Sequence, residues 1–319
     1  MEYRIFGRTG WQISEIGYGM WGMGDWSGSD DRESKQSLDL AVELGCNFFD
    51  AAWVYGKGKS EKLLGDLLRR HPGKKLYIAS KIPPLDMLWP PKKGATIGDC
   101  FPPQHIVEYT EKSLANLGVE TIDLMQFHTW EDKWVSDERW QQEVAKLKRD
   151  GKIQAVGISI NRWEPNNSLE TLKTGLIDAV QVIYNIFDQA PEDELFPLCE
   201  KLNLGVLARV PFDEGSLTGV ITRDIRFPKD DWRSSYFSLE NLMATVERVE
   251  RLQPLVPPGM SLVETALRFV LSNRTISATI PGMRKRDRVR MNIGISDGEG
   301  LPPRLLTELE KHRWDRKLR

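Results

Sequence analysis

The sequence predicts an α/β fold, a closed (β/α)8 barrel, on three observations. Eight short apolar runs recur along the chain, and segments with helical spacing of apolar residues separate them. Continuous apolar strands that alternate with amphipathic helices are typical of a parallel sheet covered on its outer face. The chain has 319 residues, and barrels of this class often exceed 200 residues as one domain. We therefore expect one barrel domain over residues 1–319.

The expected strands and helices can be placed by residue range. The apolar runs lie at residues 15–19, 46–50, 76–81, 122–127, 154–158, 178–182, 204–208 and 277–280. Helical spacing is found at residues 33–44, 60–70, 104–117, 135–149 and 193–202, and the long interval 209–276 holds two more helices, at 239–253 and 261–272. Residues 82–103 are expected to form a Pro-rich loop, and 294–319 an appended tail. Long loops on the C-terminal face of a barrel usually shape its substrate pocket.

Composition excludes several classes of protein. The net charge of −2 is near neutral, and the sequence has no basic cluster long enough to predict nucleic-acid binding. The three cysteines are an odd number, which argues against a secreted disulfide framework. The N-terminus lacks an apolar signal core, and no apolar run approaches the roughly 18 residues that a membrane span needs. We expect a soluble, cytoplasmic protein without membrane or nucleic-acid partners; the sequence carries no signal for subunit number.

Four polar side chains follow or lie close behind successive early strands. Asp50 ends one apolar run, Tyr55 comes five residues later in the loop before a helix, and Lys81 and His128 end the next two runs. Taken singly, each has an ordinary structural explanation, such as a helix cap, packing or solvent exposure. Together they lie at the end of the barrel where catalysis is found. A tyrosine, whose ordinary pKa is about 10, donates a proton effectively at neutral pH when neighbours stabilise the phenolate, so this set predicts a proton-donating site.

Other motif matches fail on their context. Residues 17–22 fit the dinucleotide pattern G-x-G-x-x-G, but residues 23–29 are turn-like and open no helix onto a pyrophosphate, so a Rossmann site is rejected. Residues 58–60 look like the end of a P-loop, but the first glycine of that motif would fall on Trp53. No Cys/His cluster has the spacing of metal ligands, so no metal site is expected.

The chain resembles the aldo-keto reductase family. The resemblance begins with residues 47–56 and 60–65, and it extends in the family's order from about residue 3 to 293. Residues 4–21 look like the N-terminal hairpin and first strand, 152–159 and 180–185 like the fifth and sixth strands, and 211–219 and 280–292 like the phosphate-binding and adenosine-binding loops. It implies a (β/α)8 barrel that reduces an aldehyde or ketone with a nicotinamide cofactor.

The resemblance also implies roles for the four polar residues. Tyr55 would donate a proton to the carbonyl oxygen. Lys81, held cationic by Asp50, would stabilise the phenolate, and His128 would orient the carbonyl as a neutral imidazole. An apolar substrate pocket is expected from four tryptophans in the loops: Trp21, Trp53, Trp89 and Trp130.

The implied cofactor residues fall into three groups. Ser159 and Gln181 match the nicotinamide-binding positions, but Ile160 splits the family's usual Ser-Asn pair. Asn161 either takes the role of that Asn or begins the next loop. The phosphate-binding loop would include Pro211, Phe212, Gly215, Ser216 and Leu217, and the backbone N–H groups near Gly215 to Leu217 would bind the pyrophosphate. Gly282, Arg284, Arg288 and Asn292 would meet the adenosine end.

Two of these implications depend on charge. Arg284, Lys285, Arg286 and Arg288 supply cations where a ribose 2′-phosphate would lie, which favours NADPH; the alternative is a solvated basic helix start. Arg209 takes the place of the family's aromatic residue at the end of strand seven. Its planar guanidinium can stack on a nicotinamide; the alternative is an ion pair with Asp213 or Glu214.

A function of another class stays open. Some members of the family act as cofactor-bound auxiliary subunits of potassium channels, in which partner binding matters more than turnover. Turnover with a carbonyl substrate would distinguish the reductase from the auxiliary subunit.

Overall fold

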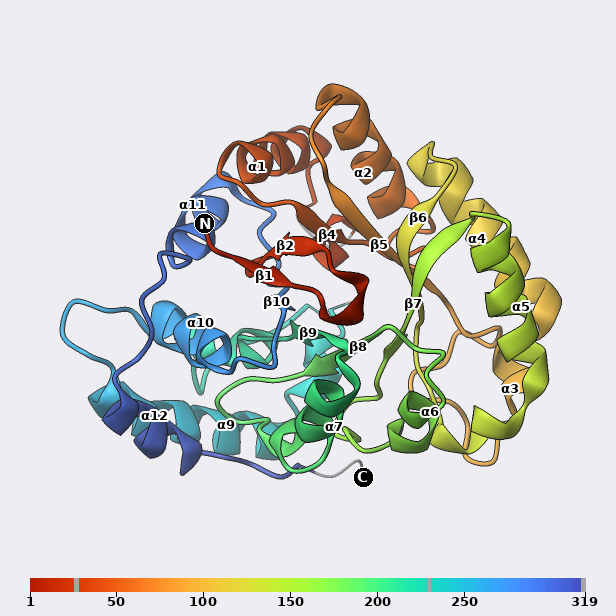
Figure 1. Ribbon diagram of the computed structural model, residues 1–319. Coiled ribbons are helices and arrows are strands. Elements are labelled where there is room, and N and C mark those ends of the chain that lie inside the picture. The colour runs from red at the N-terminus through yellow and green to blue at the C-terminus, as the bar shows by residue number, and fades with distance from the viewer. Residues whose placement is uncertain (26–28, 229–230, 317–319) are drawn as a thin grey trace.

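Eight parallel strands form the wall of a barrel in this computed structural model, which describes residues 1–25, 29–228 and 231–316. The strands are β3 (Tyr18–Gly19), β4 (Phe48–Asp50), β5 (Tyr77–Ile82), β6 (Ile122–Phe127), β7 (Ile153–Ser159), β8 (Ala179–Ile183), β9 (Gly205–Arg209) and β10 (Ala278–Thr279). Each of them overlaps one of the eight expected runs, so the predicted barrel is confirmed. Figure 1 looks along the barrel, with helices around its outside.

The sheet closes between its first and last strands. Hydrogen bonds run from Gly17 N to Thr279 O (2.8 Å) and from Gly19 N to Pro281 O (3.1 Å). A Cβ on Gly19 would lie 2.4 Å from the carbonyl oxygen of Ile280, so this seam accepts only a glycine there.

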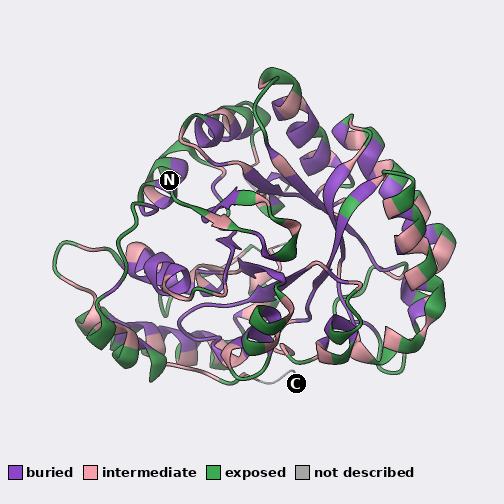
Figure 2. Cartoon of the chain, viewed as in Figure 1, coloured by how far each residue is buried: buried purple, intermediate pink, exposed green. Residues whose placement is uncertain are grey.

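Helices connect the strands and cover them from outside. They are α1 (Asp31–Glu43), α2 (Lys59–Arg70), α3 (Ile97–Cys100), α4 (Pro103–Leu117), α5 (Glu138–Arg149), α6 (Leu169–Lys173), α7 (Leu195–Leu202), α8 (Arg233–Tyr236), α9 (Leu239–Leu252), α10 (Leu262–Ser272), α11 (Arg286–Gly294) and α12 (Pro303–Glu310). The seven helices expected from spacing are all present. Figure 2 shows the amphipathic pattern from which these helices were predicted: their buried faces lie toward the strands and their exposed faces point outward.

Short helices outside these ranges were not predicted. α3 lies in the expected Pro-rich loop, α6 between β7 and β8, α8 in the interval 209–276, and α12 in the expected tail. α3 and α6 have only four and five residues, too few to display a helical period, and α3 depends on a local capping box between Thr96 and Asp99. Residues 26–28 of the expected turn and 317–319 of the expected tail lie outside the described residues.

An N-terminal hairpin closes one end of the barrel. β1 (Tyr3–Ile5) pairs antiparallel with β2 (Gln12–Ser14), and the connection between them buries Phe6 completely. The Phe6 ring lies 5.7 Å from that of Phe48, and a Cβ on Gly205 would come within 2.5 Å of it. The hairpin therefore plugs the N-terminal end, and the C-terminal end of the strands is left for a site.

Within the described residues, no helix is long and apolar enough to cross a membrane, and no group of His, Cys, Asp or Glu side chains is arranged to hold a metal ion.

Candidate active site

Strand register brings the four predicted polar residues to one end of the barrel. Asp50 is the last residue of β4 and Lys81 the last but one of β5. His128 follows β6 directly, and its N–H donates to the carbonyl oxygen of Ile82 (2.9 Å). Tyr55 lies in the turn before α2, where its N–H donates to Ala52 O (3.0 Å). Since parallel strands end at the same edge, strand pairing places Asp50, Lys81 and His128 side by side, and the turn after β4 adds Tyr55.

A buried ion pair forms the centre of the site. Lys81 Nζ donates to Asp50 Oδ2 (2.6 Å), to Ala51 O (2.8 Å) and to the Tyr55 hydroxyl oxygen (3.3 Å). The lysine side chain is fully buried and that of Asp50 nearly so. Burial alone would lower the pKa of Lys81, but Asp50 and Tyr55 outweigh it and the pKa lies above its ordinary value. The ammonium group therefore stays charged beside the tyrosine.

Two amide side chains complete the surroundings of Asp50. Its Oδ1 accepts from Gln126 Nε2 (3.1 Å) and Gln181 Nε2 (2.9 Å), so the carboxylate is held on both oxygens. We did not predict Gln126 as a site residue. It precedes His128 by two positions, and side chains two apart on a strand share a face. That spacing was the signal in the sequence.

Burial governs the protonation of Tyr55 and His128. It raises the pKa of Tyr55 above its ordinary value; Lys81 acts in the opposite direction without reversing the rise. Burial also lowers the pKa of His128 to well below its ordinary value, and the charges of Lys81 and Arg209 add to that effect. The rings of Tyr55 and His128 meet edge to face, with centroids 6.0 Å apart. The site therefore holds a protonated phenol next to a neutral imidazole at neutral pH.

Of the four expected pocket tryptophans, Trp89 contacts the site directly. Its Nε1 donates to the backbone oxygen of His128 (2.6 Å), and its ring lies 5.4 Å from the imidazole. Trp89 is 43% exposed, and Trp21, in the segment after β3, is 44% exposed. These two side chains are available to an apolar substrate group at the open end of the barrel.

The other two tryptophans point elsewhere. Trp130 was expected to line the pocket, but it is fully buried in the core with Phe127 and Trp140, and its Nε1 donates to Thr171 Oγ1 (2.9 Å). That expectation is wrong because a position just after a strand does not fix the direction of the side chain. Trp53 packs edge-on against Tyr109 of α4, with centroids 4.8 Å apart, and braces the loop that carries Tyr55.

The expected nicotinamide residues differ in what they can offer. Gln181 uses its amide N–H groups on Asp50 and on Gln126 (3.2 Å), which leaves its oxygen for a carboxamide. Asn161 is committed to the neighbouring loop: its Nδ2 donates to Trp130 O (3.1 Å) and to Glu164 (2.9 Å), and its oxygen accepts from Thr129. Ser159 ends β7 and is buried. We therefore keep Ser159 and Gln181 as candidate cofactor contacts and leave Asn161 out.

Arg209 lies near the four predicted polar residues Asp50, Tyr55, Lys81 and His128 (the tetrad) as well as near Glu214, and among the described residues it forms no ion pair with Asp213 or Glu214. Its Nη2 donates to Ile160 O (3.0 Å), and its buried Nε finds no hydrogen-bond partner in the described part of the chain. Burial lowers the pKa of Arg209 to about 10, with a further contribution from Arg162, so it is still a cation at neutral pH. Its charge reaches Tyr55 and His128, whose pKa values it lowers.

The expected pyrophosphate loop, Asp213–Thr218, follows Pro211 and Phe212 and is a short helical segment with a kink at Glu214 and Gly215. The N–H groups of Gly215 and Leu217 both donate to Phe212 O, at 2.9 and 3.1 Å. These two N–H groups, which were expected to meet phosphate, are therefore engaged inside the loop. The two acidic residues are neutralised from other segments: Arg162 pairs with Glu214 (2.6 Å) and Arg316 with Asp213 (2.7 Å).

The expected adenosine end lies at the start of α11. Arg284 donates to Gly22 O (3.2 Å), which ties this segment to the loop after β3. Arg288 is exposed in the first turn of the helix, Asn292 is buried, and Gly282 bridges to Gly19 at the barrel seam.

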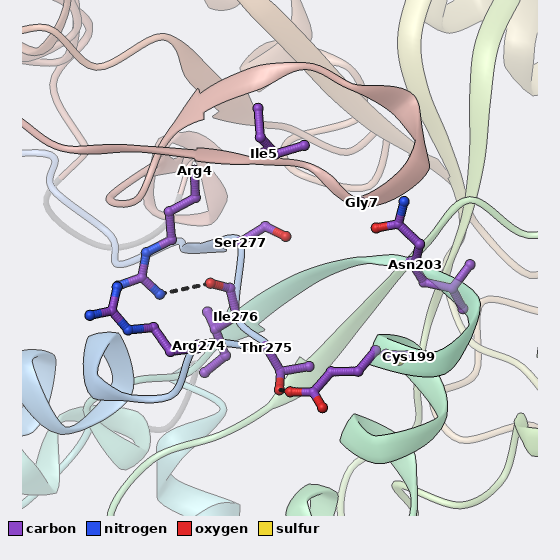
Figure 3. A pocket seen from close by; sticks show the side chains of 11 residues that line it. Arg4, Ile5, Gly7, Cys199, Asn203, Arg274, Thr275, Ile276 and Ser277 are labelled. Carbon is purple, nitrogen blue, oxygen red and sulfur yellow. Dashed lines mark hydrogen bonds between the residues drawn. The ribbon is translucent and has the colours of Figure 1, made fainter.

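A hollow of about 460 Å³ lies at the opposite, N-terminal end of the barrel (Figure 3). Arg4 of the hairpin borders it and donates to Ile276 O (2.8 Å). Arg274 and Asn203 stand at other parts of its wall. It contains none of the tetrad, so it is separate from the candidate active site.

Most of the chain matches one family of known proteins. The model of the aldo/keto reductase family matches residues 15–313. This chain belongs to that family. The predicted family membership is confirmed, and with it the oxidoreductase class.

Individual relatives cover nearly the full length. The chain is 29% identical to the NADH-specific methylglyoxal reductase of Escherichia coli (strain K12), over 95% of this chain and 97% of the relative. It is 27% identical to a probable voltage-gated potassium channel subunit beta of Oryza sativa subsp. japonica, over 93% and 92%. The glycerol dehydrogenase AKR11B4 from Gluconobacter oxydans superposes with a TM-score of 0.79 at 29% identity, over 98% and 94% of the two chains.

Proposed function

We propose that this protein reduces an aldehyde or ketone to an alcohol with NADPH, and that Tyr55 is the proton donor. The observation that carries the proposal is the buried Asp50–Lys81 ion pair, whose ammonium group lies 3.3 Å from the Tyr55 hydroxyl oxygen. A buried ion pair is costly to form and is seldom a gain in stability over apolar side chains. Its position against a buried phenol fits a site that must bear a transient phenolate.

Each side chain then has one task. Tyr55 gives its hydroxyl proton to the substrate oxygen as the carbonyl carbon receives a hydride, and Lys81 stabilises the phenolate until water returns a proton. His128, as a neutral imidazole, hydrogen-bonds the carbonyl oxygen and orients it. Asp50 keeps Lys81 charged and in place. Positioned proton transfer of this kind contributes roughly 10²–10⁴ in rate.

The residues at the barrel mouth suit a dinucleotide cofactor. Buried Nδ1 of His128 and Nε of Arg209 have no hydrogen-bond partner among the described residues, so the mouth presents polar atoms that a bound ligand can satisfy. A nicotinamide cofactor would supply the hydride. Ser159, Gln181 and Arg209 would hold its carboxamide end. Pro211, Phe212, Gly215, Ser216 and Leu217 belong to the loop that would lie against its phosphates. Gly282, Arg284, Arg288 and Asn292 would hold its adenosine end.

The direct test is NADPH oxidation, followed by the loss of NADPH absorbance, with a panel of aldehydes, ketones and quinones. We expect turnover with at least one carbonyl compound, and faster turnover with those that carry an apolar group, because Trp21 and Trp89 are exposed at the mouth. Failure with every carbonyl would refute the reductase proposal.

The basic segment before and within α11 predicts the choice of cofactor. Arg288 is exposed at the helix N-terminus, where backbone N–H groups also favour an anion. A charge-assisted contact with a 2′-phosphate is worth about 1.5–3 kcal/mol, or roughly 10- to 100-fold in affinity. We therefore expect Arg288→Ala to weaken NADPH binding by that factor and to leave NADH binding unchanged.

Fluorescence titration of both cofactors measures the effect, with Arg290→Ala as the matched control, since Arg290 is an exposed arginine of the same helix. Equal NADPH affinity in wild type and Arg288→Ala would remove Arg288 from the site. The NADH-specific relative makes this test necessary, because at 29% identity the preference of one protein does not transfer to another.

Arg209 predicts a difference between the two redox forms of the cofactor. A cation near the nicotinamide disfavours the positively charged oxidised ring, so NADPH should bind more tightly than NADP⁺. Arg209→Tyr removes the charge and places an aromatic ring there, and it should narrow that difference. The test is titration of wild type and Arg209→Tyr with NADPH and with NADP⁺. If the ratio of the two dissociation constants is the same in both proteins, Arg209 does not face the nicotinamide ring.

A second function rests on the potassium channel relative. An auxiliary subunit binds cofactor and partner with little turnover. Such a protein has no need of a proton donor, so measured carbonyl turnover that depends on Tyr55 favours the reductase.

A further inference from the structure

One arginine far along the chain ties three separate segments together beside the proposed cofactor loop. Arg316 Nη2 donates to Asp188 Oδ2 (2.5 Å) and to Asp213 Oδ1 (2.7 Å), and Nη1 donates to the Tyr236 hydroxyl (2.6 Å). Tyr236 in turn donates to Asp213 Oδ1 (3.0 Å). The Arg316 side chain is 4% exposed, which is unusual for an arginine outside an ion-pair network.

The segment that carries Arg316 is fastened along its length. Gln189 donates to Leu309 O (3.1 Å), and Trp314 N donates to Phe187 O (2.7 Å). The guanidinium of Arg248 lies 4.3 Å from the centre of the Trp314 ring. Residues 309–316 therefore run against the loop after β8 and deliver Arg316 to a fixed place.

Arg316 balances two buried carboxylates. Asp188 is 8% exposed and Asp213 1% exposed, and Arg316 bonds both of them. Burial raises the pKa of Asp188, and the negative charge of Asp213 adds to the rise, while Arg316 opposes it. A buried charge without a partner is strongly unfavourable, so the two carboxylates are compatible with this packing only while the guanidinium lies between them.

The loop that Asp213 begins is strained and needs external support. Asp213, Glu214 and Gly215 have successive φ values of +43°, +56° and +103°, a left-handed run that residues other than glycine adopt at a cost. Such a conformation persists when the surroundings determine it. Here Arg316 secures Asp213, and Arg162 secures Glu214 (2.6 Å).

We propose that Arg316 is a positioning residue for the cofactor: through Asp213 it holds the 213–218 loop in the form that binds the dinucleotide phosphates. The inference rests on the proposed function, in which this loop meets the cofactor. Arg316 bonds the start of the loop, so its effect should appear in cofactor affinity and not in the hydride-transfer step once cofactor is saturating.

The test compares NADPH dissociation constants of Arg316→Ala and Arg316→Lys with that of wild type. If the competent loop form falls to about a tenth of the population, the apparent dissociation constant rises about tenfold. We expect at least that change for Arg316→Ala, a smaller one for Arg316→Lys, and kcat at saturating NADPH within about twofold of wild type. Arg313→Ala is the matched control. Arg313 lies in the same C-terminal segment as Arg316 but pairs with Asp193 (2.6 Å) and not with a residue of the cofactor loop. The NADPH affinity of Arg313→Ala should therefore equal that of wild type.

A rescue experiment separates positioning from general loosening of the fold. Adding Asp188→Asn to Arg316→Ala removes one of the two uncompensated carboxylates, so part of the NADPH affinity should return. Wild-type affinity in both Arg316 variants would overturn this inference and leave the proposed function intact. Absence of NADPH binding to the wild-type protein would overturn both.

Discussion

Replacing Tyr55 with phenylalanine should nearly abolish carbonyl reduction. The change removes only a hydroxyl group, and the ring is 9% exposed, so its packing remains. A positioned general acid contributes roughly 10²–10⁴ in rate, and we expect kcat to fall by that factor. NADPH affinity should stay within about twofold, because a group that acts only in the transition state contributes little to cofactor binding.

Tyr109→Phe is the matched control for that loss. Tyr109 is equally buried and packs against Trp53, but it lies on α4 outside the tetrad, so its substitution should leave kcat close to wild type. A Tyr55→Phe enzyme that keeps more than about a tenth of its turnover, a loss far below the usual contribution of an acid, would exclude Tyr55 as the proton donor.

The pH profile gives an independent measurement. Burial raises the pKa of Tyr55 above its ordinary value, so the hydroxyl stays protonated through the neutral range. The pKa of His128 is well below its ordinary value, so the imidazole is already neutral there. The titration of these two groups should therefore cause no rise or fall of kcat/KM for reduction between about pH 7 and 9. A fall within that range in wild type would assign the proton to another group.

The sequence predicted the tetrad because each member is at or near the end of a strand, and strand ends are fixed by apolar runs that are easy to read. The same reasoning would have reached Gln126, which shares a strand face with His128. It failed for Trp130 because a residue after a strand can turn outward into the helix layer, where Trp140 and Phe127 receive it.

Ion pairs between residues far apart in the chain could not be predicted from the sequence. Arg209 was expected either to stack on the nicotinamide or to pair with Asp213 or Glu214. The structure neutralises these two carboxylates with Arg316 and Arg162, which are 103 and 52 residues away. No local pattern links residues at such distances, so only the folded chain reveals these partners.

Asp50→Asn should reduce both stability and activity. Lys81 Nζ lies on one side of the substituted amide and the N–H groups of Gln126 and Gln181 on the other, and all three are hydrogen-bond donors. The NH₂ group of the new Asn must therefore face one of these donors and cannot hydrogen-bond to it. Lys81 also loses its counter-charge in a fully buried position. Removing one partner of a buried ion pair typically costs about 3–5 kcal/mol.

Denaturant unfolding and steady-state rates measure the two effects. Asp66→Asn is the control: Asp66 pairs with Lys35 and Arg70 on the exposed side of α2, and surface pairs are worth about 0–1 kcal/mol. The double variant Asp50→Asn/Lys81→Met should recover stability relative to Asp50→Asn, because the unpaired buried ammonium is gone, and it should remain inactive, because nothing stabilises the phenolate. Strict additivity of the two substitutions in unfolding free energy would contradict an energetic coupling between Asp50 and Lys81.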